Sequence, residues 1–135
     1  METGVNDIHV VRLREGEEII SSLVQYAQER QVTGPFWAIG ALDEVEYAFF
    51  DREKGGYDPR RLKGFMEIVS LMGNITRLEG DPVVHCHIHA VSPSGERAAG
   101  HLLSARVSVT CEVFLITARD TIERVQGDGF NPIRD

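Results

Sequence analysis

The stretch Val83–Val91 reads Val-Val-His-Cys-His-Ile-His-Ala-Val and places a histidine at every second position. Because the side chains of a β-strand point alternately to opposite faces, one face carries His85, His87 and His89. The other face is small and apolar, as a buried core requires. Including His101, four of the five histidines lie between positions 85 and 101. Neutral imidazole is a metal ligand, and three of them suit Zn2+ with a vacant fourth position.

The length and composition indicate a single globular domain. A chain of 135 residues can bury a sizeable core. Its hydrophobic content of 42% and charged content of 26% are typical of globular proteins. The formal net charge of -7 argues against sequence-independent binding of nucleic acid, which needs a basic surface. A local basic patch stays compatible with that charge.

The cysteines and the N-terminal sequence indicate the cellular compartment in which the protein is expected. Cys86 and Cys111 lie in expected strands and lack a C-x-x-C spacing, so we expect buried, reduced thiols that fit a reducing cytosol. The N-terminus shows no apolar segment typical of a signal peptide. No run approaches the ~18 apolar residues of a membrane span. These features predict a cytoplasmic protein without membrane contact.

One helix is predicted early in the chain. Apolar residues recur with a period of 3.6 residues from Ile19 to Ala27, and the pattern ends near Arg30. Glu17 and Glu18 are expected in its first turn, where the helix dipole favours acidic residues.

The rest of the chain predicts strands. Their expected ranges are Ile8–Leu13, Phe36–Leu42, Val45–Asp51, Phe65–Met72, Ile75–Leu78, Val83–Val91, Glu96–Leu103, Arg106–Thr117 and Thr121–Val125. The second and third of these could instead form one long, bent strand, with Gly40 marking a bulge or a close backbone approach. The polar stretch Asp51–Arg61 predicts a loop or a hairpin tip.

One helix followed by many strands predicts an α+β (mixed α/β) fold with a mostly antiparallel, curved sheet, in one domain over residues 1–135. A turn at Ser92–Gly95 is expected to return the next strand beside the histidine strand, which can bring His101 towards His85 and His87. A single helix cannot cover both faces of such a sheet, so we also expect oligomerisation.

Four motifs resemble a known family in their order and spacing. They are Gly64–Gly73, His85-x-His87, Gly100–Leu102 and Thr110–Val113. The family is the PPC domain, the plant-and-prokaryote conserved domain, also called DUF296. It occurs in plant AT-hook nuclear proteins and as stand-alone bacterial and archaeal proteins, and this chain looks like a stand-alone prokaryotic member over nearly its whole length.

The resemblance implies a mixed, mostly antiparallel sheet, a homotrimer and a histidine-bound metal. The ligands that match the family motif by position are His85, His87 and His101, and the ion expected there is Zn2+. His89 has no counterpart in that motif. Adjacent same-face positions of a strand are about 6.5–7 Å apart, which separates His85 and His89 by about 13 Å. We therefore predict that His89 is not a metal ligand.

The family is commonly labelled DNA-binding. In plant members the contact with DNA is made by a basic AT-hook outside this domain, and this sequence contains no such motif. The nearest basic clusters, Arg60–Lys63 and Arg12–Arg14, are short and flanked by acidic residues. DNA is thus a partner that the net charge disfavours.

Three functions remain open at this point. The first is a trimeric zinc-binding protein with an unassigned biochemical role, which could hold a small-molecule ligand at the metal. The second is a DNA-associated regulatory or scaffold protein. The third is a metal-dependent enzyme whose open metal position holds a nucleophilic water, with Glu67 or Glu112 as the general base. Glu67 could either face water or lie buried near the histidines.

The predicted trimer needs an apolar interface. Two apolar segments that could form it are Phe36–Leu42 and Val107–Leu115. They are the candidate interface segments.

Overall fold

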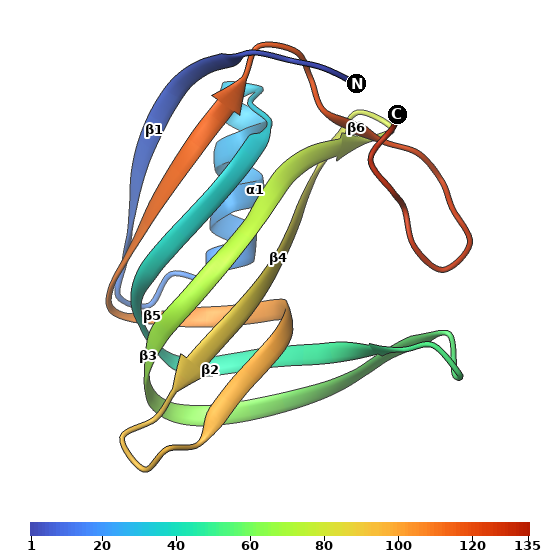
Figure 1. The fold of residues 1–135 in the computed structure, drawn as a ribbon. Helices are drawn as coiled ribbons and strands as arrows, with labels where there is room; N and C mark the ends of the chain where they lie inside the picture. The colour runs from blue at the N-terminus through green and yellow to red at the C-terminus, as the bar shows by residue number, and fades with distance from the viewer.

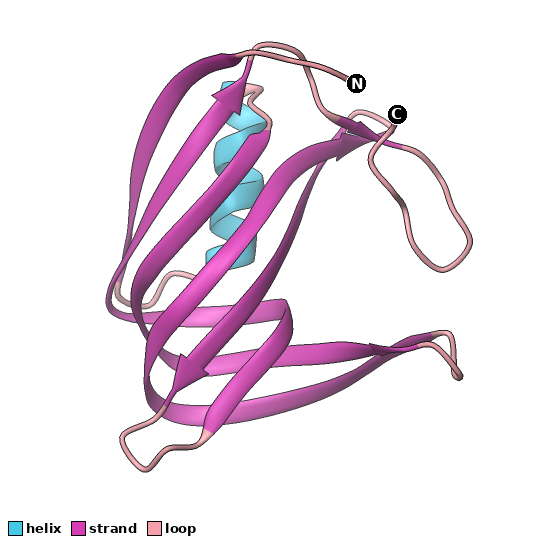
Figure 2. Cartoon of the chain, viewed as in Figure 1, coloured by secondary structure: helices cyan, strands magenta, loops and turns pink.

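A computed structural model describes residues 1–135 (Figures 1 and 2). Its elements in chain order are β1 (Val5–Arg14), α1 (Ile19–Arg30), β2 (Gly34–Asp51), β3 (Gly56–Leu78), β4 (Asp81–Val91), β5 (Arg97–Ala118) and β6 (Glu123–Arg124). No helix is long and apolar enough to cross a membrane.

The sheet has the strand order β1-β5-β2-β3-β4, and β6 pairs with β3. Every pairing is antiparallel except the short one between β3 and β6. The first part of β5 also pairs with β4, so the sheet bends until it closes on itself at that end. Helix α1 lies against the inner side of the bent sheet (Figure 1). This architecture confirms the predicted fold class.

The core lies between α1 and the sheet. The helix buries Ile19, Leu23 and Ala27 at helical spacing, and they join one cluster of 23 buried hydrophobic residues. The apolar face of β4 adds Cys86, Ile88 and Ala90 to the same cluster, as the alternation predicted. Helix α1 therefore packs behind the strand whose opposite face carries the histidines.

Three long strands replace the pairs of short strands that the sequence predicted. Strand β2 is the single bent strand offered as the alternative, and β3 and β5 likewise run through their expected breaks. Gly40 coincides with register shifts on both sides of β2, and a Cβ there would collide with the carbonyl oxygen of Thr110. The sequence predicted a bulge or a close approach at this glycine, and the structure shows both.

Several predicted boundaries were wrong. Gly73 does not end a strand, because it lies where β3 approaches β4 so closely that a Cβ would collide with the carbonyl oxygen of His85. The stretch 51–61 is the hairpin tip that the sequence predicted as one of two possibilities, but its turn is shorter than expected. The ends of β2 and β3 continue through it as a polar hairpin that extends from the body of the sheet (Figure 1). The last strand contains only Glu123–Arg124, and β1 begins at Val5.

The acidic residues before α1 also act differently from the prediction. The helix begins at Ile19, so Glu18 is its N-cap and lies outside the first turn. The Glu18 carboxylate accepts hydrogen bonds from the backbone amides of Ile20 and Ser21, each over 2.8 Å. It also accepts one from the amide of Ala105 over 3.0 Å, which ties the start of the helix to β5.

Candidate metal centre

Three histidines from two neighbouring strands meet at one place, and we call them the histidine cluster: His85, His87 and His101. His85 and His87 share a face of β4, and His101 of β5 lies directly opposite His87 in the antiparallel ladder. The ring centroid of His85 is 5.3 Å from that of His87 and 5.2 Å from that of His101. One potential ligand atom from each ring lies within 4.8 Å of the other two.

The turn between β4 and β5 produces this convergence. Ser92 donates its amide to the carbonyl oxygen of Glu96 over 2.9 Å, and Gly95 donates to that of Ser92 over 3.0 Å. These bonds close the predicted hairpin and set its register, in which His87 pairs with His101. The turn and the number of residues on either side of it therefore place the imidazole of His101 beside that of His87.

The surroundings favour the neutral form of two rings of the cluster, those of His85 and His101. Burial lowers the pKa of His85 to about 4, and the neighbouring charges of His101, Arg124 and His87 act in the same direction. The pKa of His101 is lowered chiefly by burial and further by His87. Only neutral imidazole has a free lone pair for a metal, so the lowered pKa of each ring favours the form that binds one.

The donor set fits a divalent metal ion. Nδ1 of His101 is buried and has no hydrogen-bond partner within the chain. Buried polar atoms almost always have a partner. A bound metal ion would supply the partner that this nitrogen lacks. A tetrahedral ion with bonds of ~2.0–2.1 Å needs its ligand atoms about 3.4 Å apart. Rotation of the exposed His87 ring can bring the three nitrogens closer to that spacing.

His89 lies outside the cluster. Its Nε2 is 3.0 Å from Nη1 of Arg97, in hydrogen-bond contact. On the ladder it faces Ser70 of β3 and Ala99 of β5, one step away from the pair of His87 and His101.

The two carboxylates considered as general bases also lie elsewhere in the chain. Glu67 is exposed on β3 and lines a separate hollow with Phe65 and Val69. Glu112 is exposed on β5, opposite Arg12 of β1. No carboxylate belongs to the histidine cluster. Of the two positions considered for Glu67, the structure shows the one that faces water.

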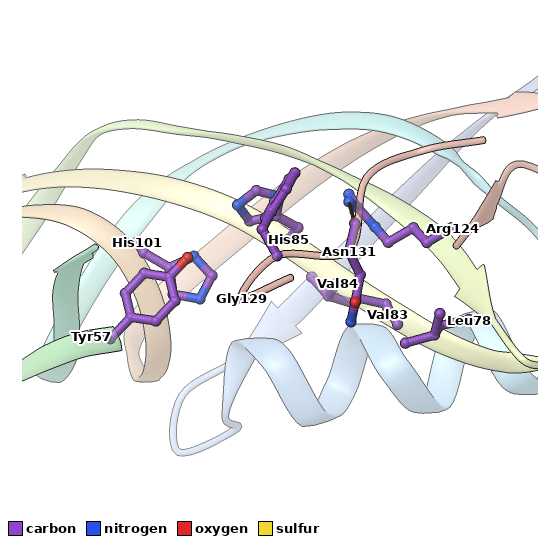
Figure 3. Close-up of a pocket in the computed structure, with 10 residues that line it drawn as sticks. Tyr57, Leu78, Val83, Val84, His85, His101, Arg124, Gly129 and Asn131 are labelled. Atoms are coloured by element: carbon purple, nitrogen blue, oxygen red, sulfur yellow. Dashed lines mark hydrogen bonds between the residues drawn. The ribbon is translucent and has the colours of Figure 1, made fainter. Parts of the chain in front are cut away.

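A cavity of about 280 Å³ adjoins the cluster (Figure 3). Its lining residues are Tyr57, Leu78, Val83, Val84, His85, His101, Arg124, Gly129, Phe130 and Asn131. Tyr57 stacks on His101 with ring centroids 4.7 Å apart at one end, Arg124 and Asn131 lie at the other, and His85 lies between. The cavity thus connects the histidine cluster with a buried arginine.

Sequence reasoning missed Tyr57, Arg124 and the C-terminal wall of this cavity. Tyr57 was assigned to a polar loop or hairpin tip, and the segment Gly129–Asn131 to an irregular tail. Neither stretch carries a periodic pattern or a motif. Their position depends on the long β2–β3 hairpin and on the pairing of β6 with β3, which are contacts between distant parts of the chain.

A bent antiparallel sheet with one helix and a histidine cluster on the β4–β5 hairpin defines the class of domain. The model of the Plants and Prokaryotes Conserved (PCC) domain matches residues 1–119, and the chain belongs to this family. This family is the one that the sequence motifs resembled. No curated protein matches the chain in sequence.

Solved structures of similar proteins agree over nearly the whole chain. A plant- and prokaryote-conserved protein of Pyrococcus horikoshii is 28% identical, with a TM-score of 0.91 over 99% of this chain and 95% of that one. A metal-containing protein of Archaeoglobus fulgidus is also 28% identical, with a TM-score of 0.90 over 99% and 97%. A protein of Bacteroides thetaiotaomicron, described as a candidate DNA-binding protein, is 26% identical, with a TM-score of 0.89 over 98% and 96%.

Proposed function

We propose that this protein binds one Zn2+ ion per chain through His85, His87 and His101. The observation that carries the proposal is the convergence of three imidazoles, one with a buried and unpartnered Nδ1. The similar protein of Archaeoglobus fulgidus contains a metal, which supports the proposal. Zinc is the preferred ion because imidazole nitrogens in a set of three suit it, with a fourth position left open.

The residues around the cluster define what such a site can do. A zinc ion with three protein ligands supplies a Lewis acid with an open position. The chain itself contributes the stacked ring of Tyr57 and the cavity towards Arg124, so a small molecule can reach the cluster. Because no carboxylate lies in the cluster, we propose binding of a ligand there and assign no turnover.

We further propose that the protein assembles as a homotrimer in the cytoplasm. The candidate interface segments 36–42 and 107–115 use one face for the chain's own core, including Phe36, Val113 and Leu115. The other face leaves Trp37 and Ile39 exposed, next to the exposed Met72 of β3. Exposed apolar side chains grouped on neighbouring strands are typical of a surface that another chain covers. Both cysteines are free and buried, which fits a reducing compartment.

The DNA-associated alternative rests on the description of similar proteins such as that of Bacteroides thetaiotaomicron. The net charge of -7 opposes it. Several exposed arginines are also neutralised, since Arg61 pairs with Glu44 and Arg106 pairs with Asp43. Salt-dependent retention of the purified protein on duplex DNA would favour this alternative over the metal-binding proposal.

Elemental analysis of the purified protein, combined with its mass in solution, tests the proposal. We expect one zinc ion per chain and a particle of three chains. Protein that takes up no zinc from a stoichiometric supply would contradict the metal assignment. A stable monomer at micromolar concentration in sedimentation would contradict the trimer and leave the metal assignment standing.

A further inference from the structure

The cavity beside the histidine cluster contains a buried cation without an anionic partner. Arg124 is only 6% exposed. Its guanidinium donates to Oγ1 of Thr76 through Nε and to Oδ1 of Asn74 through Nη2, each over 2.8 Å. Its Nη1 donates to the carbonyl oxygen of Asn131 over 2.7 Å. These acceptors are all neutral, and none of the ion pairs in the structure involves this arginine.

The second buried arginine shows what a purely structural arrangement looks like. Arg77 is 5% exposed and donates to the carbonyl oxygens of Ala27 and Gly80, over 2.8 and 3.1 Å. Ala27 lies in the last turn of α1, where the helix dipole is negative and carbonyl groups lack partners. Arg77 also donates to Oε1 of Gln28, so its acceptors are neutral too, but it lies at the negative end of a helix. The acceptors of Arg124 belong to no helix end.

Arg124 also keeps hydrogen-bonding capacity free. A guanidinium has five N–H groups. Because its three bonds leave from three different nitrogens, one N–H remains on each terminal nitrogen. Free N–H groups of a guanidinium form charge-assisted hydrogen bonds to a carboxylate. Burial lowers the pKa of Arg124, but arginine stays protonated in proteins, so its charge is available to an anion.

The cavity sets the size and character of that anion. Its volume of about 280 Å³ exceeds the ~150 Å³ cavity that accommodates benzene in an engineered protein. The walls between Arg124 and the histidines include Val83, Val84 and Phe130, which suit a short hydrocarbon body. One cation and two free N–H groups match a monoanion better than a phosphate dianion, which carries more charge and more acceptor oxygens.

We propose that this cavity binds a small organic acid, with its carboxylate on Arg124 and its other end directed towards His85 and His101. The part that reaches the histidines rests on the proposed zinc function, whereas the carboxylate end does not. Arg124 and Gly129–Asn131 lie beyond residues 1–119, so the anion end of the cavity lies outside the family match. The proposal thus names the ligand class of the proposed metal site.

A matched pair of ligands tests the proposal on the unaltered full-length protein. Benzoate and benzamide have the same size and differ in charge, so calorimetric titration of each isolates the contribution of the carboxylate. The titrations are run on zinc-free and on zinc-loaded protein. We expect benzoate to bind at least tenfold more tightly than benzamide in both forms. Equal binding, or a preference for benzoate only when zinc is present, would overturn the proposal.

Two arginine variants test whether the preference for benzoate arises at Arg124. Arg124→Gln should weaken benzoate binding at least tenfold and leave benzamide binding unchanged. Arg134→Gln is the matched control, because it removes the same charge from an exposed side chain of the same C-terminal segment, which pairs with Glu123. This control should keep the preference for benzoate. If Arg124→Gln fails to fold, as judged by circular dichroism, the comparison of ligands on the unaltered protein decides alone.

Inorganic phosphate provides a further test of ligand class. Tighter binding of phosphate than of benzoate would overturn the assignment to a carboxylate. The outcomes also separate the two proposals. Benzoate binding by a protein that takes up no zinc would support the arginine site and contradict the metal proposal. Zinc binding without any preference for benzoate would leave the metal proposal standing and reject the organic acid.

Discussion

The two faces of β4 show how one strand can serve stability and binding at once. On one face Cys86, Ile88 and Ala90 are almost completely buried against α1 and the sheet. On the other face His85 is partly buried and His87 is exposed, beside a cavity. Every residue on the first face has a partner in the core, whereas the second leaves Nδ1 of His101 without one.

The two faces of β4 therefore suit different roles. Apolar burial stabilises the fold by roughly 25 cal/mol per Å² removed from water. Desolvated imidazoles contribute no such gain, and unpaired buried nitrogens cost free energy. A strand can hold such groups only when its other face supplies the stability. The core face should therefore control folding stability, and the histidine face should control metal binding. A substitution on one face should have little effect on the property that the other face controls.

The largest effect is expected on the histidine face. His87→Ala should lower bound zinc from one ion per chain to background, because a pair of imidazoles cannot hold the ion as three can. The folded structure should persist, since His87 is exposed and contributes little to the core. Elemental analysis together with circular dichroism measures both properties. Stoichiometric zinc in this variant would show that the ligands are assigned incorrectly.

A chelator should remove the ion that the histidine face binds. Because zinc binds the native state and stabilises it by mass action, its removal with EDTA should lower the thermal unfolding midpoint of the unaltered protein. The same treatment should leave the midpoint of His87→Ala unchanged. An equal decrease in both proteins would mean that the chelator acts elsewhere. Differential scanning calorimetry provides the comparison.

The core face should show the opposite pattern. Ile88→Ala removes a side chain that is 3% exposed and should cost about 2–5 kcal/mol of unfolding free energy, through lost burial and a new cavity. The variant should still bind one zinc ion per chain when folded. Urea denaturation measures the first effect and elemental analysis the second. Loss of zinc from a folded Ile88→Ala protein would break the separation between the two faces.

Cys86 provides a sharper test because it lies between two predicted ligands and faces the core. Burial raises the pKa of this thiol to about 12, and Cys111 is affected in the same way. Neither thiol should react readily with a disulfide reagent in native protein near neutral pH, and both should react after denaturation. Cys86→Ala should keep its zinc. A Cys86 thiol that is protected by zinc and exposed by EDTA would contradict this placement.

The smallest effect is expected for the third histidine of the strand. His89→Gln should leave the zinc content near that of the unaltered protein, because His89 contacts Arg97 and lies outside the cluster. His85→Gln is the matched substitution on the same face and should reduce the zinc content. The reverse pattern in elemental analysis would move the site along the strand.

The local sequence was sufficient to predict the two faces of β4, the hairpin after it and the class of fold. Alternation along a strand and the residues of a tight turn act over short distances, so they can be read from neighbouring positions. The helix was found for the same reason. The boundaries were less certain, because glycines such as Gly73 permit close packing between strands as readily as they end them.

Only the tertiary structure decided what surrounds the histidines. Arg124 comes from a short strand near the C-terminus, and Tyr57 from the far end of a hairpin that the sequence left as either a loop or a hairpin tip. Neither position has a pattern that separates it from other polar surface residues. Their meeting at one cavity depends on the bend of the sheet and on pairing between strands far apart in the chain. Local sequence determines which face a side chain takes, and long-range packing determines which side chains that face meets.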